Sequence, residues 1–143
     1  MAREWTRADV EARLEAAARV MRAQPRVGPR GTFNAWPAYF HEFADKVGQQ
    51  PEMRRPLPSP RAVTEAEEAM VWLRWLEVDD ARLVWARAER TAWKPICWRF
   101  GISRATAVRR HLYALSVIVW RLNGRRVPKK RSMQFVIDGA RAE

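Results

Sequence analysis

The sequence predicts an all-α fold, a helical bundle with a C-terminal helix-turn-helix and a basic C-terminal arm. Apolar residues recur at three- and four-residue spacing along much of the chain, which is the period of an amphipathic helix. Capping residues precede these stretches and Gly or Pro follows them, as at helix ends. The 143 residues are 48% hydrophobic, which is enough to build a core.

Two helices are predicted in the N-terminal region. The first starts at Thr6, which suits an N-cap with Asp9 three residues on, and its pattern ends at Pro25. Its apolar side is Val10, Leu14, Ala17, Ala18 and Met21. The second runs from Asn34 to Gly48, with Pro37 tolerated in its first turn. Its apolar side is Trp36, Tyr39, Phe40, Phe43 and Val47.

A proline-rich segment then separates two parts of the chain. It contains Pro51, Pro56, Pro58 and Pro60, which exclude a regular helix or a central strand and predict a stiff, extended connector. The predicted organisation is therefore an N-terminal helical region at 1–48, a linker at 49–60, a helix-turn-helix domain at 61–124, and a basic arm and tail at 125–143.

Two further helices are predicted directly after the linker. Thr64 and Glu67 make a capping box for the first of them. Its inward side is Met70, Trp72, Leu73 and Leu76. Asp79 and Asp80 cap the second, which runs to about Arg90. It is expected to bury Leu83, Val84 and either Ala86 or Ala88.

A short helix and a long helix follow, joined by a glycine turn. The short helix begins at Thr91, keeps Pro95 in the permitted first turn and stops at Gly101. Its core candidates are Ile96, Cys97 and Phe100. Ser103 caps the long helix, which runs to about Leu122 and ends at Asn123-Gly124.

The segment after the long helix is basic. Residues 125–131 read Arg-Arg-Val-Pro-Lys-Lys-Arg, and their charge and proline argue against a helix. We expect a flexible arm there, followed by a short extended piece at 133–137.

Positive charge is concentrated in this half of the sequence. Residues 90–137 contain twelve Lys or Arg and no Asp or Glu, although the chain has sixteen acidic residues. Since the whole chain carries +11, the other 95 residues sum to −1. An ordinary helix face mixes both signs. Concentrated positive charge around a turn between helices therefore points to a nucleic-acid backbone as the partner.

The turn itself has the residue types of a helix-turn-helix. This motif needs a small residue in its first helix, a turn residue able to take left-handed dihedrals, and a polar N-cap on its second helix. Cys97, Gly101 and Ser103 meet these needs in order. The apolar wedge between the two helices is Ile96, Phe100 and Ile102.

The residues Phe100-Gly101-Ile102-Ser103-Arg104-Ala105-Thr106, followed by Ala114-Leu115, resemble the last helix-turn-helix of bacterial sigma factors, that of region four. This resemblance covers about residues 80–122 and implies DNA binding. Through the stretches at 72–76, 93–103 and 120–128, the chain is similar to a family of uncharacterised small proteins from alphaproteobacteria and their phages. That second resemblance spans nearly the whole chain and implies no activity.

Two registers are open for the long helix. In the sigma-type pattern, branched apolar residues face the core at the positions of Ala107 and Arg110. This chain instead offers a stripe of Val108, Leu112, Leu115, Val119 and Leu122. If the stripe faces inward, the outer side is Ser103, Thr106, Arg110 and Tyr113, with Arg109 beside them. The sigma-like register favours Ser103, Arg104 and Arg109.

Twelve residues are predicted to contact DNA. The main contacts are expected from Arg104, Arg109 and Arg110, because arginine suits bidentate reading of guanine, whereas Ser and Thr mostly hold phosphate. The arm should track phosphate or enter an adjacent minor groove. The complete set is Lys94, Ser103, Arg104, Thr106, Arg109, Arg110, Tyr113, Arg125, Arg126, Lys129, Lys130 and Arg131.

The eight Trp residues are expected to be mainly core residues, with Trp93 and Trp98 the weakest candidates for burial. The C-terminal half of the long helix is apolar nearly all round, since Val117, Ile118 and Trp120 lie off the stripe. Either the N-terminal helices or a second subunit covers it, and self-association as a dimer is the favoured alternative.

The sequence argues against several classes of function. A single cysteine, Cys97, excludes an intramolecular disulfide and, with only two histidines, leaves no zinc spacing. His111, on the basic helix, is expected to contact phosphate or solvent. No phosphate loop, serine elbow or pair of carboxylates is present. We expect no enzyme, no cofactor and no bound metal. The absence of a signal peptide or membrane span predicts a soluble, cytoplasmic, nucleoid-associated protein.

The predicted function is sequence-specific binding of double-stranded DNA, by a transcription regulator of bacterial or phage origin. One alternative is a DNA-packaging recognition subunit of the phage small-terminase type, in which the N-terminal helices build a ring. Another is an adaptor that binds RNA polymerase or another protein through the Trp-rich helices.

Overall fold

The computed structural model describes residues 3–24 and 56–141. In this part of the chain all regular structure is helical and no strand is present, which confirms the predicted all-α class. The elements are α1 (Arg7–Ala23), α3 (Pro60–Trp72), the 3-10 helix η1 (Leu73–Trp75), α4 (Val78–Ala88), α5 (Trp93–Phe100), α6 (Arg104–Leu122) and α7 (Met133–Gly139). The helix predicted at 34–48 and most of the predicted linker lie outside the described residues.

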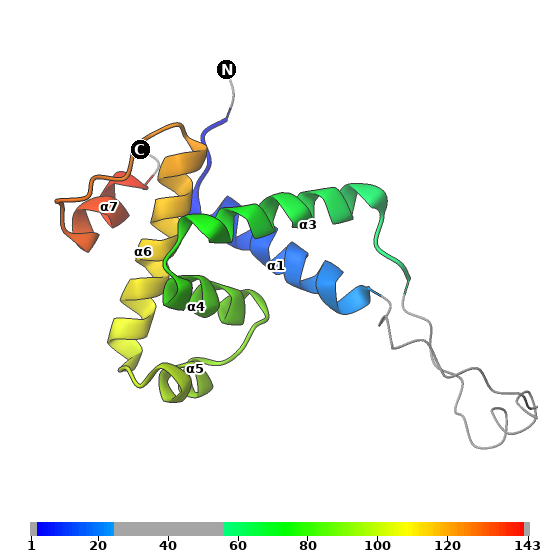
Figure 1. The fold of residues 1–143 in the computed structure, drawn as a ribbon, viewed down its shortest axis with the longest axis horizontal. Helices are drawn as coiled ribbons and strands as arrows, with labels where there is room; N and C mark the ends of the chain where they lie inside the picture. Colours follow the sequence, from blue (N-terminus) through cyan, green and yellow to red (C-terminus); the bar gives the residue numbers. More distant parts are fainter. Residues whose placement is uncertain (1–2, 25–55, 142–143) are drawn as a thin grey trace, which may run out of the picture.

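The helices form one bundle around α6 (Figure 1). Helices α1 and α3 pack side by side and run in opposite directions, since Trp5 before α1 meets Trp72 at the end of α3, edge to face at 5.4 Å. Helices α4 and α5 contact α6 toward its N-terminal half, while α7 contacts its C-terminal half. None of the described helices is long and apolar enough to cross a membrane.

One hydrophobic core joins α1 to the segment beyond the proline-rich stretch. Leu14 of α1, Val84 of α4 and Ile118 of α6 are each at most 1% exposed and belong to the same cluster, to which α3 adds Trp72. The predicted apolar side of the first helix is confirmed except for Met21, which is 45% exposed. Helix α1 therefore packs into the same core as the segment predicted to be a separate domain at 61–124.

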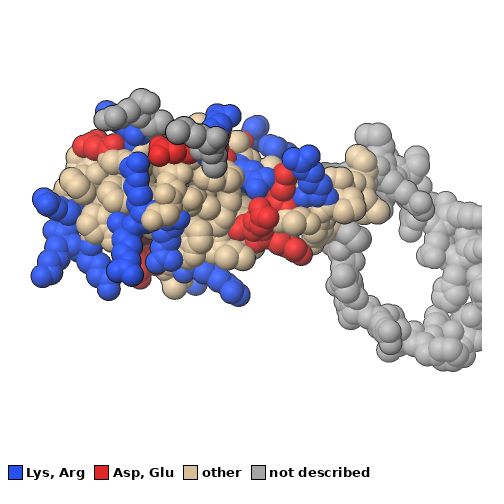
Figure 2. All heavy atoms as spheres, turned by 90° about the horizontal axis from the view of Figure 1, so that it is seen from above, with Lys and Arg blue, Asp and Glu red and all other residues tan. Residues whose placement is uncertain are grey.

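Several acidic residues lie where α1 packs against α3. Arg13 of α1 makes ion pairs with Glu65 at 2.9 Å and Glu68 at 3.1 Å, which tie α1 to α3. Figure 2 shows one large Asp and Glu cluster and, at the left end of the molecule, many Lys and Arg side chains with smaller Asp and Glu patches beside them.

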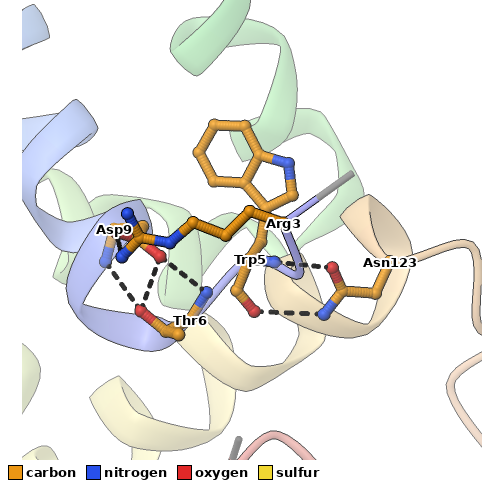
Figure 3. Close-up of polar contacts among 5 residues, drawn as sticks. All are labelled: Arg3, Trp5, Thr6, Asp9 and Asn123. Carbon is orange, nitrogen blue, oxygen red and sulfur yellow. Dashed lines mark hydrogen bonds and ion pairs between the residues drawn. The ribbon is translucent and has the colours of Figure 1, made fainter. Parts of the chain in front are cut away.

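Helix α1 begins with the predicted cap, which is a capping box. The Thr6 hydroxyl accepts a hydrogen bond from the Asp9 amide at 3.2 Å, and the Asp9 carboxylate accepts one from the Thr6 amide at 3.0 Å (Figure 3). The Thr6 hydroxyl also donates a hydrogen bond to the Asp9 carboxylate at 2.7 Å. This bond, together with the one from the Thr6 amide, stabilises the charged carboxylate, so the pKa of Asp9 lies below its usual value.

A side-chain clamp fixes the segment just before α1. Asn123, at the end of α6, accepts a hydrogen bond from the Trp5 amide at 2.8 Å and donates one to the Trp5 carbonyl at 3.1 Å (Figure 3). The two residues are 118 positions apart in the sequence. The start of α1 and the end of α6 are therefore held together by a two-bond pairing.

Two predicted helix starts are wrong by a few residues. Helix α3 begins at Pro60 with Ser59 as its cap, and Thr64 lies inside the helix, where its hydroxyl donates to the Pro60 carbonyl at 3.1 Å. The reason is that Pro at the first helical position is already set for the helix, so the turn before Thr64 is helical too. Helix α4 has Glu77 at its N-cap, which places Asp79 and Asp80 in its first turn.

The extended piece predicted at 133–137 is wrong, because these residues start helix α7. Ser132 caps the helix by accepting from the Phe135 amide at 3.3 Å. The Trp120 indole donates to the Val136 carbonyl at 2.9 Å, and Gly139 lies so close to the same ring that no Cβ would fit. Tertiary packing against α6 therefore stabilises a helix too short to show a sequence period.

Helices α1 and α7 also cover the apolar C-terminal half of α6. Ile118 is fully buried and Val117 is 7% exposed, while α7 buries Val136 and Ile137. Within the described residues, the chain itself thus covers the surface for which a second subunit was the favoured alternative.

We expect Asn123→Ala to lower the free energy of unfolding by about 1–3 kcal/mol, because two hydrogen bonds to the Trp5 backbone are lost. Urea unfolding followed by tryptophan fluorescence measures the change. Gln134→Ala is the control, since its amide only bonds Asp138 on the surface, and it should change stability by no more than about 0.5 kcal/mol. Equal effects of the two variants would contradict the role of the clamp.

Candidate nucleic-acid interface

The turn between α5 and α6 has the predicted backbone roles. Gly101 ends α5 with φ 63° and ψ 35°, in the left-handed region. A Cβ at this position would meet no atom within 4 Å. Glycine is therefore favoured here by the left-handed backbone conformation and not by a lack of space. Ser103 caps α6 by accepting from the Thr106 amide at 3.2 Å. Together these two residues set the direction in which α6 leaves the turn.

Burial along α6 shows which side of the helix faces the core. Ala107, Ala114 and Ile118 are fully buried. Of the predicted stripe, Leu115 and Val119 are buried, whereas Val108, Leu112 and Leu122 are only half-buried. The inward side of α6 therefore includes Ala107 together with part of the stripe.

Arg110 is half-buried and faces α4, which corrects its expected place on the outer face of the long helix. Its guanidinium makes an ion pair with Asp80 of α4, with Nη2 and Nε at 2.9 and 3.1 Å from Oδ1. The Asp80 side chain is only 9% exposed. A carboxylate this buried needs a cationic partner, because losing that partner leaves an uncompensated charge. Arg110 is thus a structural residue that ties α6 to α4.

The outer face of the first turns of α6 is polar and basic. Ser103, Arg104, Thr106 and Arg109 are all exposed. The hydroxyls of Ser103 and Thr106 lie 2.9 Å apart. Tyr113, one turn farther along, is half-buried. Four of the predicted contacts thus share one accessible surface at the start of α6.

Helix α5 adds basic and aromatic side chains. Lys94 is exposed, as predicted, and so are Arg99 and Trp98, the latter at 82%. Neither Arg99 nor Trp98 was among the predicted contacts. The signal that could have found them is the placement of Trp98 next to Arg99, which already made it a weak candidate for burial.

Most of the basic side chains from the acid-free stretch remain unneutralised. Arg90 pairs with Glu15 at 3.6 Å, Arg110 with Asp80, and Arg125 with Glu4 at 3.6 Å. The other basic residues of this stretch are exposed and make no ion pair with the described residues. They are Lys94, Arg99, Arg104, Arg109, Arg121, Arg126, Lys129, Lys130 and Arg131.

The predicted basic arm is a loop that returns to the bundle. Residues 123–132 connect α6 to α7 (Figure 1). The Arg131 guanidinium lies 5.1 Å from the centre of the Phe135 ring, and Val127 and Pro128 are half-buried. Because α6 has 19 residues at about 1.5 Å each, the loop lies roughly 28 Å from Ser103. The loop and the first turn of α6 are therefore two separate basic surfaces.

His111 is buried, so its prediction as a phosphate or solvent contact is wrong. It is 7% exposed and meets the Trp93 ring edge to face at 5.6 Å. Burial, assisted by the positive charge of Arg87, lowers its pKa to about 4. The imidazole is therefore neutral at pH 7. Its position next to Arg110 had instead predicted a place on the basic surface of the helix.

A family model described as "Domain of unknown function (DUF6362)" matches residues 22–118. This match covers more than half of the chain, so the chain belongs to that family. The matched region includes α3, α4, α5 and most of α6, and with them the turn at Gly101. No curated protein and no solved structure matches the chain.

Stability should fall as the pH is lowered from 7 to 5. His111 titrates near pH 4 in the folded protein and near 6.5 when unfolded, so the unfolded state binds more protons in this window. The expected loss is about 2 kcal/mol between pH 7 and pH 5. Urea unfolding at several pH values measures it.

His111→Phe keeps an aromatic ring against Trp93 and removes the titrating group. Its free energy of unfolding should depend less on pH between 7 and 5, whatever its value at pH 7. An unchanged pH slope in this variant would contradict the assignment to His111.

Proposed function

We propose that this DUF6362 protein binds double-stranded DNA in a sequence-specific way, with α5 and α6 as a helix-turn-helix, and regulates transcription in a bacterium or phage. The observation that carries the proposal is the set of exposed Lys and Arg side chains on α5, α6 and the 123–132 loop that make no ion pair with described residues. Unpaired cations of this density gain free energy by releasing counterions from DNA.

In this proposal the first turns of α6 enter the major groove. Arg104 and Arg109 read base edges, for which the bidentate guanidinium is suited. Ser103 and Thr106 hold phosphate, next to the positive end of the helix dipole. The first turn of α6 contains no acidic residue, so no charge there opposes a phosphate.

Arg110 supports the interface without touching DNA. Its ion pair with the buried Asp80 holds α6 to α4. Helix α5 contacts α6 and also packs its buried Ile96 against Leu83 and Ala86 of α4. A recognition helix held on both sides presents Arg104 and Arg109 in one orientation. Little ordering is then needed on binding, which favours affinity.

The 123–132 loop meets a different part of the same duplex. It lies roughly 28 Å along α6 from Ser103, close to the 34 Å repeat of B-form DNA. Lys129 and Lys130 are exposed there and would neutralise phosphates beside the groove that α6 occupies. The loop thus adds affinity, while α6 supplies selectivity.

A second candidate, contact with a protein such as RNA polymerase, is favoured by Trp98. An indole that is 82% exposed on the surface of α5 is the kind of side chain that anchors protein interfaces. In the DNA-binding proposal the same ring packs on the sugar-phosphate backbone beside Lys94 and Arg99.

We expect the double variant Arg104→Glu, Arg109→Glu to weaken binding to a selected duplex by at least about 30-fold, since each arginine-guanine contact contributes about 1–3 kcal/mol. The duplex is first obtained by selecting bound sequences from a random pool, and fluorescence anisotropy then measures affinity. The matched control is Arg19→Glu, an exposed arginine on α1, which should bind nearly as well as the unmodified protein. A double variant that keeps its activity in the cell without binding DNA would support the protein adaptor.

The salt dependence tests the 123–132 loop. With about six phosphates neutralised, log affinity should fall against log salt with a slope of roughly −5. Lys129→Ala with Lys130→Ala should make the slope about two units shallower and weaken all duplex sequences alike. A loss confined to the selected sequence would contradict a phosphate-binding role for the loop.

A further inference from the structure

A cavity of about 530 Å³ lies on a different part of the bundle from the outer face of α6. It is bounded by the start of α1, by α5 and α6, and by the end of α7, with Thr6, Trp93, Leu112 and Ala140 among its lining residues. Small-molecule sites usually measure about 300–1,000 Å³. The volume is therefore enough for a ligand with one ring.

One wall of the cavity is a stack of three side chains. The Arg87 guanidinium lies over the Trp93 ring at 4.3 Å, and this ring meets the His111 ring edge to face at 5.6 Å. The apolar side chains of Leu112 and Leu115 continue the wall. A flat apolar group would find a surface of rings and methyl groups there.

The polar residues of the cavity are mostly cationic. Arg7, Arg87 and Arg141 all line it, and among the described lining residues Glu11 is the one carboxylate. His111 is neutral at pH 7 because its pKa is about 4. The net charge at the cavity is thus positive, which favours an anionic ligand.

Part of this polar surface is already oriented. Arg7 is held by a hydrogen bond from its guanidinium to the Ile137 carbonyl at 2.7 Å, and Arg87 by one to the Thr91 carbonyl at 2.8 Å. The guanidinium groups of Arg7 and Arg87 are therefore held in place by the protein itself. Two buried nitrogen atoms of the wall, His111 Nδ1 and Arg87 Nε, have no hydrogen-bond partner among the described residues.

We propose that this cavity binds a small aromatic carboxylate, with the ring against Trp93 and Leu112 and the carboxylate toward the arginines. Arginine pairs with carboxylates through two parallel hydrogen bonds. The combination of an aromatic wall with cationic groups distinguishes this ligand class from phosphate, which has no apolar part. The inference goes beyond DNA binding and does not depend on it.

The test uses benzoate as the probe on the full chain without DNA. Titration followed by ¹H-¹⁵N NMR should give saturable shifts that are largest for residues around Trp93 and His111. Benzyl alcohol, which keeps the ring without the charge, should bind at least tenfold more weakly, and so should inorganic phosphate. Equal binding of benzoate and benzyl alcohol, or no saturable shift with benzoate, would overturn the proposal.

Matched variants locate the site. Ala8 and Ala12 are both exposed on α1, but only Ala8 lines the cavity. Ala8→Trp should obstruct it and weaken benzoate binding at least tenfold, whereas Ala12→Trp should leave binding unchanged. Glu11→Gln removes the opposing carboxylate and should strengthen binding severalfold. Unchanged affinity in Ala8→Trp, or weaker binding in Glu11→Gln, would place the ligand elsewhere and overturn the assignment.

Discussion

The buried ion pair between Asp80 and Arg110 is the constraint on which the outer surface of α6 depends. The Asp80 side chain is 9% exposed and lies 2.9 Å from the guanidinium, so its charge cannot be left without a partner. Turning α6 to expose Arg110 would bury other polar groups and leave Asp80 unpaired. With Arg110 facing α4, Arg104 and Arg109 face outward. The ion pair thereby determines which arginines are available to another molecule. Through Asp80, α4 influences the surface that α5 and α6 form.

The same bundle separates three kinds of environment within a short distance. Apolar packing of α1, α3, α4 and α6 forms one core, and the ion pairs of Arg13 with Glu65 and Glu68 hold α1 to α3. The basic side chains of α5, α6 and the following loop remain largely without such partners. Between these regions, the Arg87, Trp93 and His111 stack faces a cavity. The basic surface and the cavity can thus be altered by separate substitutions.

Local chemistry made much of the fold predictable. Thr6 with Asp9, Gly101 and Ser103 have the expected roles because caps and left-handed turns are set by neighbouring residues. The failures were tertiary in origin. Helix α7 forms because Trp120 and Gly139 fit together. Arg110 faces inward because Asp80 lies on another helix, and His111 is covered by Trp93. In each case the partner lies in another segment, so the sequence pattern of one helix could not predict the contact. The exposure of Trp98 could be predicted only in part, from its charged neighbour Arg99.

The pairing of Trp5 with Asn123 determines how early the chain can fold during its synthesis. Its two residues are 118 positions apart, so at roughly 5–20 residues per second the ribosome adds the second about 6–24 seconds after the first. During that interval α1 has no α6 to pack against, and the apolar side containing Leu14 and Ala17 has only part of its final cover. The core can close only when α6 has been synthesised. Non-local closure of this kind slows folding and leaves the apolar side of α1 partly exposed during synthesis.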